Sequence, residues 1–162
     1  MPKMNIEYKA HDTVTPEEMQ SLEDSVGFAF HRNVERNRTA LAGSLFVATA
    51  RCNGRLVGLV RLVGDGAYIL HVAGLTVDPD FQRKGVGRQL MQMAIAFARE
   101  SKIGAGDNMG EFTLFAHAGA DTLYERLGFT LARNGMVLTD TESRQDHELN
   151  FEFEWKRRRD QR

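Results

Sequence analysis

Residues 77–88 read VDPDFQRKGVGR, and they join a strand-like run of sequence to a long amphipathic helix. The first backbone N–H groups of a helix have no partner inside it and carry a partial positive charge. Glycine at positions 85 and 87 lets a ligand approach that backbone without meeting a Cβ atom. The segment is therefore a candidate anion site, and a pyrophosphate suits it. The alternative is a tight turn that the two glycines merely shape.

The side chains around the glycines favour a phosphate ligand but match neither of two common motifs. Four of them, Gln82, Arg83, Lys84 and Arg88, would add hydrogen-bond donors and positive charge. A dinucleotide-binding fingerprint needs a third glycine at position 90, where the chain has leucine. A P-loop needs Gly-Lys-Ser/Thr, which does not follow here.

Hydrophobic periodicity on both sides of this loop predicts an α+β domain around a mixed sheet. Upstream, strands are expected over 5–9, 45–51, 56–63 and 67–77, with helices over 16–26 and 34–42. Downstream, a helix of about four turns begins at Val86, and a strand over 112–116 follows. A short helix over 122–127, capped by Asp121, and strands over 129–133 and 149–155 complete the expected order.

Two local signals support this assignment of elements. Thr15-Pro16-Glu17-Glu18 has the residues of a capping box, with proline at the first helical position. Asn53-Gly54 joins two strand-like runs and is the strongest short-range signal for a β-hairpin.

The composition of the 162-residue chain excludes several classes of protein and site. It is 42% hydrophobic and 27% charged, which is typical of a folded globular domain. Cys52 is the only cysteine, so an intramolecular disulfide or a zinc site built on cysteine pairs is excluded. The net charge of −1 argues against nucleic-acid binding. We find no signal peptide and no apolar stretch long enough to span a membrane, and we expect a cytoplasmic protein.

The motifs resemble those of the GNAT superfamily of acyl-coenzyme A N-acyltransferases. Its central motif, Gln/Arg-x-x-Gly-x-Gly/Ala, stands here as QRKGVG over residues 82–87, after the strand end LTVDP over 75–79. Its second motif, a helix tyrosine followed by Gly-Phe, stands as LYERLGF over residues 123–129. The resemblance covers roughly residues 44–137. It implies a mostly antiparallel mixed sheet with helices on both faces.

The resemblance also implies the co-substrate and the residues that bind it. In that family the loop amides hold the pyrophosphate of acetyl-CoA, and the fourth strand pairs its backbone with the pantetheine arm. The residues that match are Leu75, Thr76, Val77, Gln82, Arg83, Lys84, Gly85, Val86, Gly87 and Arg88. No metal is needed for the chemistry.

The resemblance identifies a catalytic acid but leaves the catalytic base open. Tyr124 matches the family tyrosine that protonates the departing thiolate. Many members carry an acidic base where this chain has Gly74, and Ala118 replaces a frequent asparagine. His71 is the candidate base, because an imidazole titrates near neutral pH. The alternative is a hydrogen-bonded histidine with a structural role only. His117 is a second candidate, and activation by water alone is a third.

We therefore expect an acetyl-CoA-dependent N-acetyltransferase that acts on a small-molecule primary amine by direct attack. The alternatives are a protein or peptide N-acetyltransferase and a non-catalytic acyl-CoA-binding module. The acceptor side is expected at the first two helices, the loop between them and the final hairpin. In that early region Phe28, Phe30 and His31 either pack in the core or line the acceptor pocket.

The C-terminal region supports two further expectations. Residues 1–155 form a single domain, and the basic tail 156–162 is disordered. Alternation over 149–155 suggests either a homodimer paired through that strand or a protected sheet edge.

Overall fold

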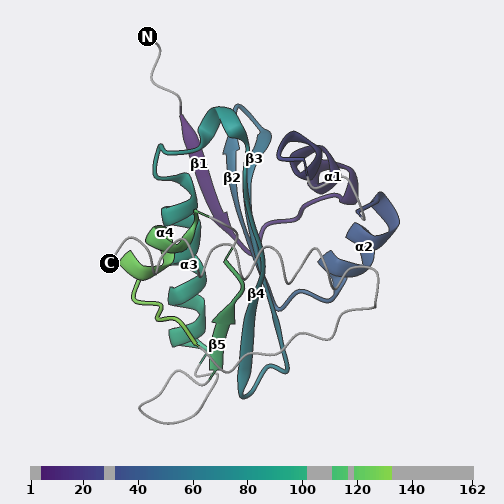
Figure 1. Cartoon of the computed structure of the whole chain (residues 1–162). Coiled ribbons are helices and arrows are strands. Elements are labelled where there is room, and N and C mark those ends of the chain that lie inside the picture. Colours follow the sequence, from purple (N-terminus) through teal and green to yellow (C-terminus); the bar gives the residue numbers. More distant parts are fainter. Residues whose placement is uncertain (1–4, 28–31, 102–110, 117–118, 133–162) are drawn as a thin grey trace, which may run out of the picture. The chain divides into compact units, whose positions relative to one another are not determined.

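The computed structural model describes residues 5–27, 32–101, 111–116 and 119–132. It contains two compact units, Met1–Phe115 and Ala116–Arg162, each of which is described by itself. In the first unit (Figure 1) the elements are β1 (Ile6–Ala10), α1 (Pro16–Ser25), α2 (Val34–Ala42), β2 (Phe46–Cys52), β3 (Arg55–Gly64), β4 (Ile69–Val77), the 3₁₀ turn η1 (Pro79–Phe81), α3 (Val86–Glu100) and β5 (Glu111–Leu114). The second unit contains α4 (Asp121–Arg126).

One five-stranded sheet organises the first unit, with its strands in the order β1-β2-β3-β4-β5. The first four strands are antiparallel neighbours, and only β4 and β5 run parallel. This is the mixed, mostly antiparallel sheet of an α+β protein that the sequence predicts. The prediction of a single domain over 1–155 with a basic tail stays a prediction, because residues 133–162 lie outside the described part.

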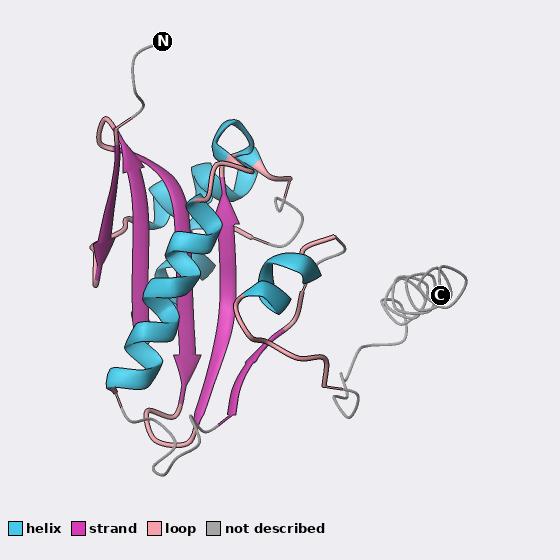
Figure 2. Cartoon of the chain, turned by 90° about the vertical axis from the view of Figure 1, so that its left-hand side faces the viewer, coloured by secondary structure: helices cyan, strands magenta, loops and turns pink. Residues whose placement is uncertain are grey.

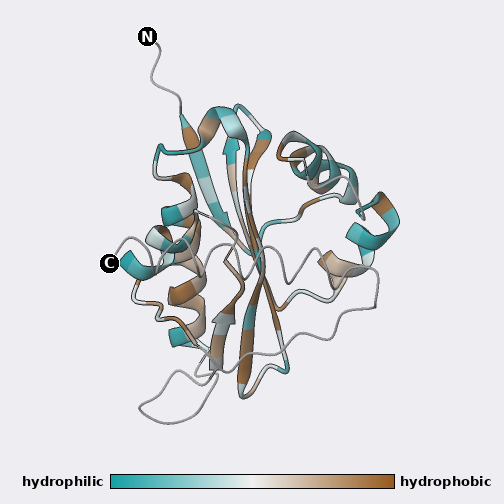
Figure 3. Cartoon of the chain, viewed as in Figure 1, coloured by the Kyte–Doolittle hydropathy of each residue, from teal (hydrophilic) through white to brown (hydrophobic). Residues whose placement is uncertain are grey.

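Helices cover both faces of the sheet, with α3 on one face and α1 and α2 on the other (Figures 1 and 2). Hydropathy along the chain shows hydrophobic residues concentrated on the central strands β3 and β4 (Figure 3). On the face of α1, the buried core consists of Val14, Met19, Leu22, Leu56 and Leu59.

A glycine on β3 sets how closely α3 approaches the other face. A Cβ atom at Gly58 would lie 2.9 Å from Leu90 Cδ1 and 3.0 Å from Val86 Cγ1. Both of those α3 residues are buried. The close approach holds the first turn of α3 against the sheet, and that turn follows directly from the 77–88 loop.

Local signals place several elements where the sequence predicts them. The capping box of α1 is present, with Glu18 N–H donating to Thr15 Oγ1 at 3.1 Å and Thr15 N–H donating to Glu18 Oε2 at 2.9 Å. Asn53 and Gly54 both have positive φ, at 51° and 80°, as a type I′ hairpin turn requires.

Two expectations for the second unit are wrong. Ala120, not Asp121, is the N-cap residue of α4, and its side chain makes no capping hydrogen bond. Residues 129–132 form no strand. The turn brings Phe129 back onto α4 instead, because its N–H donates to the carbonyl oxygen of Tyr124 at 3.0 Å. The expected strand over 149–155 lies outside the described residues. Within the described part, no helix is both long and apolar enough to cross a membrane.

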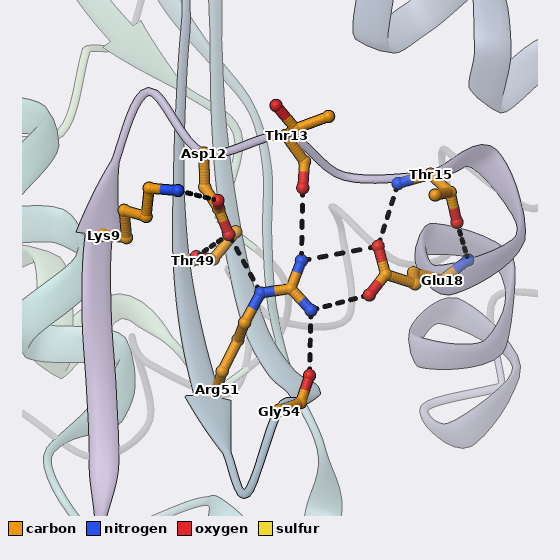
Figure 4. Close-up of polar contacts among 8 residues, drawn as sticks. All are labelled: Lys9, Asp12, Thr13, Thr15, Glu18, Thr49, Arg51 and Gly54. Carbon is orange, nitrogen blue, oxygen red and sulfur yellow. Dashed lines mark hydrogen bonds and ion pairs between the residues drawn. The ribbon is translucent and has the colours of Figure 1, made fainter.

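An ion network fastens the start of α1 to the sheet (Figure 4). Arg51 on β2 donates from Nε to Asp12 at 2.9 Å and from Nη1 to Glu18 at 2.6 Å. Asp12 also accepts from Lys9 and from Thr49, at 2.9 Å and 2.8 Å. Burial alone would raise the pKa of Asp12, but these hydrogen bonds outweigh it and hold the pKa well below its usual range.

Candidate active site

The loop after β4 is anchored by a buried carboxylate. Asp78 is 5% exposed and accepts hydrogen bonds from Arg55 Nη1 at 2.8 Å and from the N–H of Asp80 at 2.9 Å. Its own N–H donates to the carbonyl oxygen of Val57 on β3 at 2.9 Å. Asp78 therefore ties the 3₁₀ turn η1 to the sheet and fixes the direction in which the loop leaves β4.

Side chains that the sequence assigns to a phosphate also stabilise the loop itself. Gln82 Nε2 donates to the carbonyl oxygen of Val77 at 2.9 Å, and Lys84 Nζ donates to that of Asp80 at 2.6 Å. The ammonium of Lys84 lies 5.6 Å from the ring centroid of buried Phe81, within cation–π range. Arg83 and Arg88 are both exposed. The loop thus holds its own shape and presents two guanidinium groups to solvent.

The loop ends in a residue conformation that favours glycine. Gly85 is the N-cap residue of α3, with φ of 85° and ψ of −2° in the left-handed region. The first helical hydrogen bond runs from Gln89 N–H to the carbonyl oxygen of Gly85, at 3.0 Å. The amides of Val86, Gly87 and Arg88 therefore have no acceptor within α3. They form the positive end of a 15-residue helix, a suitable site for an anion.

The backbone of β4 leads from the centre of the sheet to this loop. Arg61 on β3 pairs with Gly74, whereas the next residue, Leu62, pairs with Val72, so Ala73 is an extra residue on β4. The pairing of β4 with β5 runs only from Ile69 to Val72. Beyond that point, residues 73–77 have a strand partner on the β3 side alone within the described part. Among the described residues, nothing therefore continues the sheet on this edge of β4, and its backbone groups suit pairing with an extended ligand that reaches the start of α3.

His71 lies on β4 directly opposite Thr113 of β5. Its Nδ1 is 2.9 Å from Thr113 Oγ1, and its ring centroid is 5.3 Å from that of Phe115. Burial lowers the pKa of His71 below its usual value. The imidazole is therefore neutral at pH 7 and able to accept a proton.

Tyr124 belongs to α4 in the second unit and is half-buried there. Its ring meets the ring of Phe129 edge to face, with the centroids 6.0 Å apart. Gly128 has φ of 95°, which lets the chain turn so that Phe129 reaches it. Burial raises the pKa of Tyr124, so the phenol keeps its proton at neutral pH. That is the protonation state that a general acid requires.

The comparison with known families decides the classification. The family model of the acetyltransferase (GNAT) domain matches residues 11–137, which is most of the chain. The chain belongs to the GNAT acetyltransferase family.

Relatives and solved structures agree with this membership. The chain is 28% identical over 123 residues to an uncharacterized N-acetyltransferase, ycf52, of Pyropia yezoensis, covering 74% of this chain and 67% of that protein. A GNAT-family acetyltransferase from Streptococcus pneumoniae TIGR4 is 29% identical with a TM-score of 0.68, over 85% of this chain and 99% of that one. The aminoglycoside N-acetyltransferase AAC(6')-Iy, solved in complex with CoA, shares the fold with a TM-score of 0.64 and 14% identity, over 87% of this chain and 99% of that one.

The structure places the residues expected to bind the co-substrate of this GNAT protein in one continuous stretch. Leu75, Thr76 and Val77 lie on the β4 edge, and residues 82–88 form the loop and the first turn of α3. His71 lies on the same strand. Among the other candidates, Phe28, Phe30, His31, His117 and Ala118 lie outside the described residues.

Two contacts near the candidate site are not predicted from the sequence, although Asp78 lies in the segment that the sequence singles out. Asp78 and Arg55 form the ion pair that anchors the loop, and Thr113 contacts the candidate base. The Asp-Pro dipeptide at 78–79 is a sequence signal for a cap, because aspartate often caps the turn that follows it. Arg55 and Thr113 are recognised only from the strand pairing.

Proposed function

We propose that this GNAT protein is an N-acetyltransferase that moves an acetyl group from acetyl-CoA to the primary amine of a small molecule by direct attack. The observation that carries the proposal is the edge of β4 over residues 73–77, which has no strand partner within the described part of the chain and leads into the amide-rich start of α3. An extended pantetheine arm can pair with the strand edge. Its pyrophosphate then meets the backbone amides of Val86, Gly87 and Arg88.

The residues present suit the charge and shape of acetyl-CoA. Gly85 adds no Cβ above the amides, and exposed Arg83 and Arg88 flank them with positive charge. The CoA complex of the aminoglycoside acetyltransferase supports the same assignment, since that protein shares this fold.

The proposed reaction needs one proton acceptor and one proton donor. When bound, acetyl-CoA supplies a thioester, whose carbonyl carbon forms a bond to the amine nitrogen while its bond to sulfur breaks. His71 accepts the proton that the amine releases, and Tyr124 donates its phenolic proton to the departing sulfur. Backbone N–H groups beside the Ala73 bulge would stabilise negative charge on the carbonyl oxygen.

Calorimetric titration with acetyl-CoA tests the co-substrate assignment. We expect Gly85→Glu to abolish the binding heat, because a carboxylate there repels the pyrophosphate. Gly66→Glu is the matched control, since Gly66 also has a positive φ (78°), is also free of neighbours within 4 Å, and precedes the opposite end of β4. Wild-type protein that gives no heat at several temperatures would overturn the proposal.

Thiol release with a panel of amines and peptides tests the transfer step. Turnover with small amines supports the proposal, and turnover with peptides alone would instead indicate a protein N-acetyltransferase. Acetyl-CoA binding without turnover of any acceptor would indicate a non-catalytic binding module.

A further inference from the structure

The side chain of Arg61 is buried in the sheet face that α1 and α2 cover. Arg61 is 6% exposed and lies beside Val47 of β2, which packs against the core cluster of that face. Its Nη1 donates to the carbonyl oxygen of Ala40, in the last turn of α2, and to Ser44 Oγ, both at 2.8 Å. A cation at this position suits the negative end of α2.

The other edge of this guanidinium has no hydrogen-bond partner among the residues that the structure describes. Nη1 uses both of its hydrogens, whereas Nε and Nη2 make no hydrogen bond within the described part of the chain. No fully buried side-chain nitrogen or oxygen there lacks a partner, so these two nitrogens keep some access to solvent. Nε and Nη2 form the planar fork that matches the two oxygens of a carboxylate.

Arg51, on the neighbouring strand, is an arginine of the same sheet whose hydrogen bonds and charge are fully matched. All three of its nitrogens are hydrogen-bonded, and two carboxylates, Asp12 and Glu18, balance its charge (Figure 4). Arg61 is more deeply buried and has no carboxylate within ion-pair distance among the described residues. Buried charges are usually paired, so the missing counter-charge needs an explanation.

The nearby acidic group does not fill this role. Glu23 is buried on α1, but its two oxygens accept hydrogen bonds from Arg32 and from Asn37. Desolvation lowers the pKa of Arg61, the neighbouring charge of Arg32 lowers it further, and Glu23 only partly opposes them. An additional anion beside Arg61 would be stabilised by this local excess of positive charge.

The residue opposite Arg61 leaves room at the proposed reaction centre. Arg61 pairs with Gly74 on β4, and side chains of directly opposed residues project from the same face. A Cβ atom at Gly74 would meet no atom of the described residues within 4 Å. Gly74 also adjoins the Ala73 bulge and precedes the strand residues that we assign to the thioester end of acetyl-CoA.

We propose that the Nε–Nη2 edge of Arg61 binds the carboxylate of the acceptor, and that the acceptor is an α-amino acid rather than a simple alkylamine. The assignment rests on the proposed acetyl transfer and specifies its substrate. One carbon separates amine from carboxylate in such an acceptor. A carboxylate held by Arg61 therefore keeps the amine next to the β4 edge at Gly74.

Matched acceptors test this assignment. Thiol release is measured for L-amino acids and for the corresponding α-amides, which keep the side chain and the amine but lose the negative charge. We expect Arg61→Met to lower the acid-to-amide ratio of kcat/KM by about 10- to 100-fold, the usual worth of hydrogen bonds to a charged group. Comparing the ratio between wild type and variant cancels the different basicities of the two amines. The KM for acetyl-CoA stays unchanged.

Two further variants separate recognition from folding. Ser44→Ala removes a contact of Nη1 but leaves the fork intact, so its acid-to-amide ratio should equal that of wild type. Arg61→Lys keeps the charge without the fork and should give an intermediate ratio, which covers the case in which Arg61→Met does not fold. Equal ratios in wild type and both Arg61 variants would overturn the carboxylate assignment while leaving acetyl transfer intact. Absence of turnover with every acceptor would instead overturn the proposed function and this assignment with it.

Discussion

His71 Nδ1 on β4 lies 2.9 Å from Thr113 Oγ1 on β5, and the parallel register of the two strands creates this contact. When Nδ1 carries the proton and donates it to the hydroxyl, Nε2 retains the lone pair that a base needs. Thr113 is then a positioning residue for His71.

The first prediction concerns the pH dependence of turnover. Burial lowers the pKa of His71, so the imidazole is neutral above its lowered pKa and loses its function as a base only below about pH 6.5. We expect kcat/KM to fall on acidification through that region. His71→Gln should lower kcat/KM by about 10²- to 10⁴-fold and remove this acidic limb.

The Thr113 variants extend the same experiment. Thr113→Val loses the hydroxyl, so it should lower kcat/KM and shift the pH at which kcat/KM falls on acidification. Thr113→Ser keeps a hydroxyl and should restore both properties. An acidic limb that persists in His71→Gln belongs to the acceptor amine, and full activity of that variant would assign the deprotonation to water.

The second prediction concerns Tyr124. Removing the hydroxyl in Tyr124→Phe should lower kcat by about 10²- to 10⁴-fold with little change in the KM for acetyl-CoA. The ring contact with Phe129 needs no hydroxyl, so the thermal stability should also be unchanged. Because burial raises the pKa of Tyr124, the alkaline loss of activity should begin above about pH 10. Wild-type kcat in Tyr124→Phe would exclude it as the acid.

The third prediction contrasts two glycines. Gly58→Ala should destabilise the fold by about 1–3 kcal/mol through overpacking, because the added Cβ would lie 2.9 Å from Leu90 Cδ1. Gly85→Ala should cost about 1–2 kcal/mol through its φ of 85°, since a Cβ there meets no neighbour. Urea unfolding measures both changes. In the double variant Gly58→Ala/Leu90→Val, the smaller side chain should reduce the loss of stability caused by Gly58→Ala. In Gly85→Ala/Leu90→Val, the two losses of stability should simply add. An equal coupling energy in the two double variants would contradict overpacking as the specific cause at Gly58.

The fourth prediction concerns the Arg51 network. Hydrogen bonds hold the pKa of Asp12 below its unfolded value, so its contribution to the free energy of unfolding is fully present above about pH 4 and is lost on further acidification. Asp12→Asn should therefore be less stable than wild type at pH 7, by about 1.5–3 kcal/mol. The difference should shrink toward pH 2. Parallel stability curves for the two proteins would show that Asp12 does not titrate in this way.

Expectations from the sequence succeed where neighbouring residues suffice. The helix Val34–Ala42 has the bounds that its sequence pattern predicts. In the second unit, by contrast, two predictions from local sequence are wrong. Asp121 is a good cap by residue type, yet Ala120 occupies that position. Phe129 begins a strand-like run, yet its amide bonds to Tyr124 and its ring packs on α4. Contacts with a helix outweigh strand propensity there.

Neighbouring residues specify most of the helices, strands and turns, because a capping box, an Asn-Gly turn and an α3 that begins after Gly85 depend on residues a few positions apart. Which side chains contact one another depends instead on how the strands pair and the helices pack. Thr113 lies 42 residues from His71 in the chain, and Arg61 lies 21 from Ala40. Only strand register and helix packing bring such pairs within hydrogen-bond distance. The bulge at Ala73 and the anchoring of Asp78 by Arg55 arise in this way. So does the guanidinium edge of Arg61, which has no hydrogen-bond partner within the described part of the chain.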